Sequence, residues 1–491
     1  MTRKKLRIVF ASPEMVPYAK TGGLADVVGT LPKEIQTLGQ EVLCFLPKYK
    51  KIDTSRWPLK EVVDRLQIPV GSEIETGRVF RYDDADGLQI YFIDQPEYFS
   101  RDELYGTPLG DYPDNDRRFI FFQRAVLEAL KKLGLRPDVI HCHDWQTGLI
   151  APYLKTLYAN DPLFAKTKTI FTIHNLAYQG NFPPDSMPVT GLGWDMFRLE
   201  RLEFWGKVSF LKGALVYSDA LTTVSPRYAQ EIQTKEYSCG MEGVLQMRRD
   251  DLVGIVNGID PKEWDPENDP DLPFHFSAKK LEGKAQDKAA LQKENHLPTD
   301  SRVPVFGMIT RLADQKGLDI LAPAVEGLVK RGIQLVLLGT GEEKYHQLFR
   351  DLGKKYPRQM GIHILFDAKL AKRIYAGSDV FLMPSRYEPC GLGQLISLRF
   401  GTVPLVRETG GLADTVKDFN PTSGEGTGFV FKEYDTKAFL AAVDRALTTF
   451  RDEKLWSKLV KNGMKCDFSW HASAKKYLEL YERVERKVVN V

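Results

Sequence analysis

The stretch VPVFGMITRLADQKGLDILAPAVEGLVKRGIQLVLL, residues 303–338, decides the fold class. Its two ends, 303–309 and 333–338, are almost continuously apolar, which is typical of strands buried on both faces of a parallel sheet. Residues 318–330 between them have the apolar spacing of a helix. A strand, a helix and a second strand in this order predict a parallel sheet with a right-handed crossover.

The same alternation continues along the chain and divides it into two series. Strand-like runs of the first series lie at residues 7–12, 41–46, 88–93, 138–142, 169–174, 220–224 and 253–256. Those of the second lie at 303–309, 333–338, 362–366, 379–383, 403–406 and 428–431. We therefore predict an α/β protein of two doubly wound domains, with a hinge at residues 257–261, where Asn-Gly favours a turn and a proline follows.

The composition excludes several classes of protein. Of the 491 residues 43% are apolar, so the chain is not mainly disordered, and 68 Lys+Arg against 65 Asp+Glu leave a net charge of +3. Five scattered cysteines without a CxxC pair argue against a disulfide framework or a zinc ribbon. No apolar run approaches the ~18 residues of a membrane span, and the first apolar stretch ends at Pro13, too early for a signal peptide. We expect a cytoplasmic protein with no membrane or nucleic-acid partner.

The end of the chain carries one apolar stripe at helical spacing. Its members are Trp470, Ala474, Tyr477, Tyr481, Val484 and Val488. The stripe predicts an amphipathic helix, which either packs on its own domain or crosses back to the first one.

Eight residues are nearly repeated in the two halves of the chain. TGGLADVV at 21–28 returns as TGGLADTV at 409–416, with seven of eight positions identical. A glycine pair lets the backbone approach a ligand closely, and the helix that follows supplies unpaired N–H groups. Lys20 adds a cation to the first copy. The pattern favours a phosphate site, and the alternative is a tight connection between elements.

A second candidate phosphate site follows the strand at 303–309. Arg311 and Lys316 place two cations within six residues at the carboxyl end of a parallel strand, which suits a diphosphate. A solvated loop is the alternative. GTGEEK at 339–344 is not a dinucleotide fingerprint, because Lys344 stands at the third glycine position.

Polar residues at other strand ends complete the candidate site. Glu388 follows the strand at 379–383 and precedes Pro and glycines, so its carboxylate is rigidly presented, and Cys390 is a small residue there rather than a nucleophile. His141 and His143 share a strand face, but a third metal ligand of clear spacing is missing. We therefore favour a polyhydroxylated ligand over a metal at these strand ends.

These motifs, in this order, resemble those of the bacterial glycogen synthases and plant starch synthases, glycosyltransferase family five. The resemblance rests on KTGGL (20–24), HDWQTG (143–148), TIHNLAYQG (172–180), VNGID (256–260), RLADQKG (311–317), SRYEPCGLGQL (385–395), TGGLADTV (409–416) and FSWHASAKKY (468–477). It implies a GT-B fold, in which two Rossmann-like domains face a deep cleft and the last helix crosses back to the first domain. Residues 1–257 with the helix 468–491 then form the acceptor side, and 258–467 form the nucleotide-sugar side.

The resemblance also implies an activity and a set of site residues. The activity is transfer of glucose from an ADP-glucose donor to the non-reducing end of an α-1,4-glucan acceptor such as glycogen, with retained anomeric configuration and with neither metal nor organic cofactor. Contacts to the donor phosphates are implied for Lys20, Gly22, Gly23, Arg311, Lys316, Thr409 and Gly410. Contacts to the sugar or its pocket are implied for Asp144, His174, Asn257, Glu388, Cys390 and Gly391, with Tyr178 and Gln179 in the His174 loop and Tyr105 as an aromatic platform. The predicted catalytic residues are Asp144, His174, Arg311, Lys316 and Glu388.

Some alternatives stay open at the level of sequence. Many retaining enzymes of the wider superfamily carry a second Glu eight residues after the first, where this chain has Ile396; that fits the glycogen synthase branch. The chain could still use UDP-glucose, or be a catalytically silent glucan- or nucleotide-binding protein. Retention allows a covalent intermediate on Glu388 or attack from the face of departure, and we favour the second.

Overall fold

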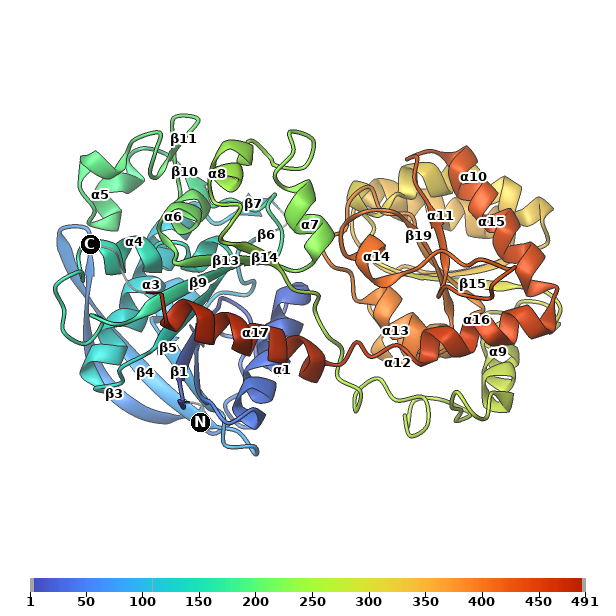
Figure 1. Cartoon of the computed structure of the whole chain (residues 1–491), viewed down its shortest axis with the longest axis horizontal. Helices are drawn as coiled ribbons and strands as arrows, with labels where there is room; N and C mark the ends of the chain where they lie inside the picture. The colour runs from blue at the N-terminus through green and yellow to red at the C-terminus, as the bar shows by residue number, and fades with distance from the viewer. Residues whose placement is uncertain (1–3, 108, 488–491) are drawn as a thin grey trace. The chain divides into compact units, whose positions relative to one another are not determined.

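The computed structural model describes residues 4–107 and 109–487, which divide into two compact units (Figure 1). Unit 1 comprises the described residues of Met1–Val224, Ala229–Ile255 and Trp470–Val491. Unit 2 comprises Ser225–Tyr228 and Val256–Ser469. Each unit is built around one large sheet flanked by helices, so the predicted α/β fold with two Rossmann-like domains is confirmed.

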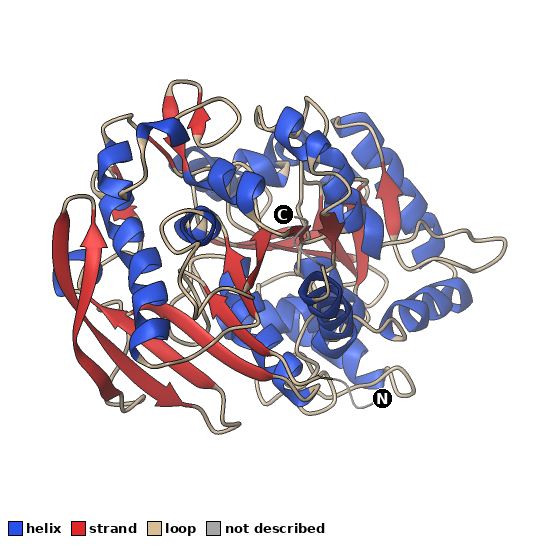
Figure 2. Cartoon of the chain, turned by 60° about the vertical axis from the view of Figure 1, so that its left-hand side comes forward, coloured by secondary structure: helices blue, strands red, loops and turns tan. Residues whose placement is uncertain are grey.

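In the described part of unit 1, nine strands form a sheet of order β14-β13-β9-β8-β1-β2-β5-β4-β3. Their bounds are β1 Arg7–Ala11, β2 Glu41–Pro47, β3 Lys60–Val70, β4 Glu73–Asp83, β5 Gln89–Asp94, β8 Val139–His143, β9 Lys168–Ile173, β13 Ala220–Thr223 and β14 Leu252–Gly254. Neighbours from β14 to β5 pair in parallel, and every predicted run of the first series is a strand. The sequence analysis missed β3 and β4, a long antiparallel pair that Figure 2 shows at one edge of the sheet.

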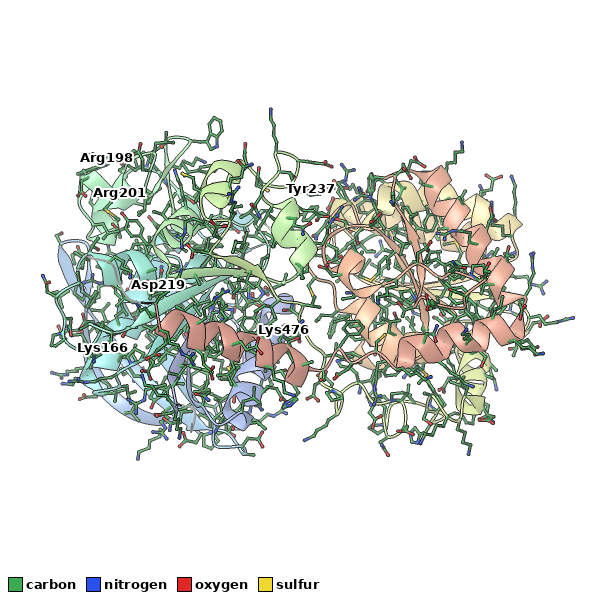
Figure 3. All side chains as sticks on the ribbon, viewed as in Figure 1. Lys166, Arg198, Arg201, Asp219, Tyr237 and Lys476 are labelled. Atoms are coloured by element: carbon green, nitrogen blue, oxygen red, sulfur yellow. The ribbon has the colours of Figure 1, made fainter. Side chains whose placement is uncertain are left out.

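The other elements assigned mainly to unit 1 cover or extend this sheet. The helices are α1 Gly23–Thr37, α2 Pro96–Phe99, α3 Asn115–Lys132, α4 Ile150–Lys155, α5 Ser186–Thr190, α6 Phe210–Tyr217, α7 Pro226–Glu231, α8 Glu242–Met247 and α17 Trp470–Glu485. Short strands are β6 Gly106–Thr107, β7 Gly110–Asp111, β10 Asn181–Phe182, β11 Glu203–Phe204 and β12 Lys207–Ser209. Asp219, labelled in Figure 3, accepts hydrogen bonds from the N–H and hydroxyl of Thr169 and so ties the start of β13 to β9.

Helix α17 packs on unit 1, as the second interpretation of the C-terminal stripe predicted. It lies beside α1 (Figure 1), and Tyr477, Tyr481 and Val484 are fully buried. The Tyr481 hydroxyl lies 2.8 Å from Nδ1 of His141 at the centre of the sheet. Val488, the last member of the stripe, lies outside the described residues.

Across residues 256–469, all of which are described, six parallel strands form a sheet of order β17-β16-β15-β18-β19-β20. Their bounds are β15 Val305–Ile309, β16 Gln334–Leu338, β17 Met360–His363, β18 Val380–Met383, β19 Val403–Arg407 and β20 Phe429–Phe431. The helices are α9 Glu282–Glu294, α10 Leu318–Lys330, α11 Glu343–Lys355, α12 Ala368–Gly377, α13 Gly393–Arg399, α14 Gly410–Thr415, α15 Thr436–Phe450 and α16 Glu453–Met464. The strand–helix–strand unit read from residues 303–338 is thus β15-α10-β16.

Candidate active site

Each sheet has one point at which the strand order reverses. In unit 1 this switch point lies between β1 and β8, and in unit 2 between β15 and β18. Open α/β sheets bind ligands just beyond the carboxyl ends of the strands at such points. The predicted site residues lie in loops that follow these strands or others of the same sheets: His174 follows β9, 409–411 follow β19, and Tyr105 lies between β5 and β6. We call Glu14, 20–23, Tyr105, Asp144 and His174 the first half-site, and Arg311, Lys316, 388–391 and 409–411 the second half-site.

The glycine loop of the first half-site has an open side. Gly22 is extended (φ −150°), and Gly23 begins α1. A Cβ built on either glycine would meet no described atom within 4 Å. Neither backbone strain nor packing therefore requires glycine at 22 or 23, and the backbone there is open to close approach by a ligand. Lys20 beside them is half-exposed and lies 2.6 Å from Asp26.

Glu14 organises this loop, and the sequence analysis missed it. Its Oε2 accepts the N–H of Thr21 at 2.5 Å and that of Gly22 at 3.3 Å. Its Oε1 accepts the hydroxyls of Thr21 at 2.5 Å and Tyr105 at 2.7 Å. Tyr105, predicted as an aromatic platform, directs its hydroxyl to this carboxylate. The available signal was a carboxylate placed just after the first strand.

Asp144 and His174 follow the neighbouring strands β8 and β9 and lie together. Oδ1 of Asp144 accepts the backbone N–H of His174 at 2.8 Å, and Asp144 has a left-handed backbone (φ 55°). Burial, with a smaller contribution from the nearby Glu14 carboxylate, raises the pKa of Asp144 to about 7. Its carboxyl group therefore titrates near neutral pH.

A chain of histidines backs the first half-site. His143 Nδ1 lies 3.0 Å from His174 Nε2, and burial lowers the pKa of His174 to about 3, so both rings are neutral at physiological pH. The ring nitrogens of His141 are bound by Tyr481 and Thr172. Within residues 4–107 and 109–487, no group of three His, Cys, Asp or Glu side chains could hold a metal ion.

The two residues of the His174 loop lie at its outer end. Tyr178 is 50% exposed, and Nε2 of Gln179 donates to the carbonyl of Cys239 at 3.0 Å. Oε1 of Gln179 accepts from Asn181 Nδ2 at 2.9 Å, so this side chain binds both its own loop and the Cys239 segment.

In the second half-site, Lys316 and Glu388 form a buried ion pair. Lys316 Nζ lies 2.7 Å from Glu388 Oε2, and the side chains are 18% and 7% exposed. The hydroxyl of Ser385 donates to the same oxygen at 3.0 Å. The sequence analysis gave these two residues different partners, a phosphate and a sugar; the structure brings them together across 72 residues of chain.

The second glycine loop is packed against the Glu388 segment. Gly410 has φ 44°, and a Cβ built on it would lie 1.9 Å from the Glu388 carbonyl oxygen. The Gly411 N–H donates to that same oxygen at 3.1 Å. Thr409 precedes α14 as its N-cap residue. Gly391 also has positive φ (74°).

The remaining predicted residues border this segment. Burial raises the pKa of the Cys390 thiol to about 12, so it is not a nucleophile at neutral pH. The Asn257 backbone N–H lies against that thiol, and Asn257 Oδ1 is buried without a hydrogen-bond partner among the described residues. Nη2 of Arg311 donates to Gln315 Oε1 at 3.2 Å on the exposed side of the loop after β15.

Two Rossmann-like units, with a cation and a carboxylate paired at the switch point of the second, are typical of GT-B glycosyltransferases. The model of the starch synthase catalytic domain matches residues 7–247, and that of glycosyl transferases group 1 matches 290–465. The chain is 49% identical to a glycogen synthase of Koribacter versatilis (98% of this chain, 99% of the relative) and 48% identical to one of Syntrophotalea carbinolica (97% and 99%). It belongs to the family of the glycogen and starch synthases.

Two solved structures match the chain over nearly its whole length. The catalytic domain of starch synthase IV from Arabidopsis thaliana, bound to ADP and acarbose, superposes with a TM-score of 0.91 at 37% identity, over 99% of this chain and 100% of that chain. Sucrose-phosphate synthase from Thermosynechococcus elongatus shares the fold, with a TM-score of 0.60 at 17% identity over 98% and 99%. Among the described residues, none of the helices is long and apolar enough to cross a membrane.

Proposed function

We propose that this chain is a retaining glycosyltransferase that moves glucose from ADP-glucose to the non-reducing end of an α-1,4-glucan. The observation that carries the proposal is the buried Lys316–Glu388 pair at a switch point, since donor phosphates need a cation and glucose hydroxyls need an acceptor. The glycogen synthase relatives and the ADP in the Arabidopsis structure support donor and acceptor alike. Unit 2 is proposed to bind the nucleotide sugar, and unit 1 the glucan.

Breaking the sugar–phosphate bond leaves negative charge on the departing diphosphate and positive charge at the anomeric carbon. We assign the diphosphate charge to Arg311, Lys316 and Lys20, which stabilise it electrostatically. The chemistry needs no metal or organic cofactor on this view.

Proton transfer follows from the state of the histidines. With a pKa of about 3, the His174 ring is neutral at neutral pH and too weakly basic to take the proton of the acceptor hydroxyl. The leaving phosphate is therefore the group that takes the proton of the acceptor hydroxyl. The neutral His174 ring lies beside the transferring glucose, and Asp144 holds the His174 backbone in place.

Retention is assigned to attack from the face of departure. The Glu388 carboxylate already contacts Lys316 and Ser385, and these donors reduce its nucleophilicity while fixing its direction. Glu388 then orients glucose hydroxyls, with the Cys390–Gly391 backbone. Isolation of a glucosyl ester on Glu388 would overturn this assignment.

A cytoplasmic location is proposed on the state of the thiols. The five cysteines all lie in the described ranges and are free. Free thiols are typical of a reducing compartment.

The test is incorporation of radiolabelled glucose into glycogen from ADP-glucose and, separately, UDP-glucose. Lys316→Ala is expected to lower the rate by about 10²–10³-fold, the usual effect of removing one electrostatic donor. Lys330→Ala, which removes an exposed lysine paired with Glu326, is the matched control and keeps the rate. Faster transfer from UDP-glucose would replace the proposed donor. Glucan binding without transfer from any nucleotide sugar would make this a binding protein instead.

A further inference from the structure

Glu14 is a buried carboxylate to which the mechanism above gives no task. Its side chain lies between three segments: the end of β1, the loop before α1, and the loop that carries Tyr105. It is 5% exposed, although a carboxylate is rarely buried without partners. The four donors from Thr21, Gly22 and Tyr105 are what make this burial stable.

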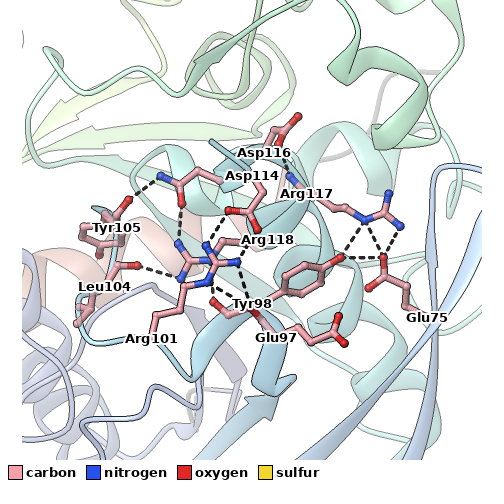
Figure 4. A network of polar contacts seen from close by, with 11 residues as sticks. Glu75, Glu97, Tyr98, Arg101, Leu104, Tyr105, Asp114, Asp116, Arg117 and Arg118 are labelled. Atoms are coloured by element: carbon pink, nitrogen blue, oxygen red, sulfur yellow. Dashed lines mark hydrogen bonds and ion pairs between the residues drawn. The ribbon is translucent and has the colours of Figure 1, made fainter. Parts of the chain in front are cut away.

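The Tyr105 end of this arrangement is held from behind by α3. Asn115 Nδ2 donates to the carbonyl of Tyr105 at 2.8 Å, and Arg118 Nη2 donates to that of Leu104 at 3.1 Å. Arg118 is fully buried and also donates to Asn115 Oδ1 at 2.6 Å. Figure 4 shows Leu104 and Tyr105 at one end of this network, beside Arg118. The Tyr105 hydroxyl is thus presented to Glu14 from a fixed backbone.

The Glu14 carboxylate has no acceptor capacity left for a substrate. An ionised carboxylate offers about four lone-pair sites on its two oxygens. Thr21 and Gly22 N–H groups engage one oxygen, and the hydroxyls of Thr21 and Tyr105 engage the other. The same count shows that the Gly22 amide, expected to contact the donor, is already bound by the protein.

We propose that Glu14 is a positioning residue, which fixes Thr21 and Gly22 so that Lys20 and the open faces of Gly22 and Gly23 are presented to the donor phosphates. The proposal deepens the proposed function and rests on it. Glycine pairs are flexible, and an undirected loop at this place would spread Lys20 and the start of α1 over many positions. A carboxylate that accepts two successive N–H groups and the Thr21 hydroxyl holds the loop in one of these positions.

Three variants separate positioning from charge. Glu14→Ala removes both acceptor oxygens and with them all four hydrogen bonds, and it is expected to lower kcat by about 10²-fold, as for a misplaced catalytic group. Glu14→Gln is expected to recover most of this loss: its carbonyl oxygen accepts the two N–H groups, and its NH₂ donates to the Thr21 and Tyr105 hydroxyls, which accept as readily as they donate. Tyr105→Phe removes one donor and is expected to have a smaller effect than Glu14→Ala. Glu103→Ala, an exposed acid paired with Lys51 near Tyr105, is the control and changes nothing.

Hydrogen exchange supplies a readout that does not depend on activity. The Thr21 and Gly22 amides are expected to exchange slowly in the wild type, much faster in Glu14→Ala, and at an intermediate rate in Glu14→Gln, while core amides of β1 and α3 stay unchanged. Equal loss of kcat in the Gln and Ala variants would assign Glu14 a charge role and overturn the proposal. Unchanged exchange at Thr21 and Gly22 in Glu14→Gln and Glu14→Ala would overturn it as well. A wild type that transfers no glucose, yet shows this exchange pattern, would refute the proposed function but not the positioning of the loop by Glu14.

Discussion

Two copies of TGGLAD, at 21–26 and 409–414, share their sequence and differ in what their glycines do. In the first copy, Gly22 and Gly23 face open space, and the loop is held by the side chain of Glu14. In the second, Gly410 and Gly411 touch backbone carbonyls of Glu388 and Cys390, so the chain itself requires glycine there. The same motif therefore leaves its glycines open in one unit and packs them against the Glu388–Cys390 backbone in the other.

The two copies also differ in how the charged groups near them are buried. The first half-site keeps buried acids beside neutral imidazoles, and its cation, Lys20, is half-exposed. The second half-site holds its cation in a buried ion pair. Substitutions in the first half-site are therefore expected to change stability and activity separately. Substitutions in the second half-site are expected to change both together.

The largest effect is expected for Gly410→Ala. The new methyl group would lie 1.9 Å from the Glu388 oxygen, in a backbone of φ 44° that L-residues rarely adopt. Overpacking and backbone strain together cost about 3–5 kcal/mol of unfolding free energy. Urea denaturation of the variant measures this loss. An unfolding midpoint equal to that of the wild type would show that packing against Glu388 does not require glycine at position 410.

The next effect concerns the two lysines. Lys316→Ala leaves Glu388 buried without its cation and is expected to lower the unfolding free energy by about 3 kcal/mol. Lys20→Ala breaks an exposed pair with Asp26 and is expected to cost under about 1 kcal/mol. Denaturant unfolding of both variants tests the contrast. Equal losses would mean that the two half-sites do not differ in how their cations are held.

The fold could be predicted from the sequence much further than the site. Continuously apolar runs identified every strand that is parallel and buried, because both faces of such strands exclude water. The β3–β4 pair was missed because one face is solvated, so its apolar positions alternate with charged ones. The Lys316–Glu388 pair joins residues 72 positions apart, and the contact of Glu14 with Tyr105 spans 91, which local patterns do not encode.

The third effect is a difference in pH dependence. The pKa of Asp144 is about 7 in the folded chain and about 4 in an unfolded one, so the folded state binds more protons between these values and loses stability as the pH rises through them. Asp144→Asn keeps the acceptor for the His174 N–H and removes the titration. From pH 5 to 7, the wild type is expected to lose about 2 kcal/mol relative to this variant.

The buried histidines give the pH experiment its internal check. His174, with a pKa of about 3, stays neutral in the fold while the unfolded chain takes up a proton below pH 6.5, so stability falls as the pH drops. Both proteins share this acid-side loss, and their difference isolates Asp144. A difference that stays constant from pH 5 to 7 would show that Asp144 is ionised throughout, as an acid in an open, solvated half-site would be.

The smallest effect, Gly22→Ala, decides whether the first copy faces a ligand. Its φ of −150° suits alanine and no described atom lies within 4 Å of the new Cβ, so stability is expected to stay within about 0.5 kcal/mol. Glucose transfer is expected to fall about tenfold, or about 1.4 kcal/mol, because the methyl group holds the donor phosphates away from the backbone. Gly243→Ala in α8, another glycine with open surroundings, is the matched control and leaves transfer unchanged. Full activity in Gly22→Ala would show that the open face of Gly22 is not needed for ligand binding. The contrast with Gly410 would then be lost.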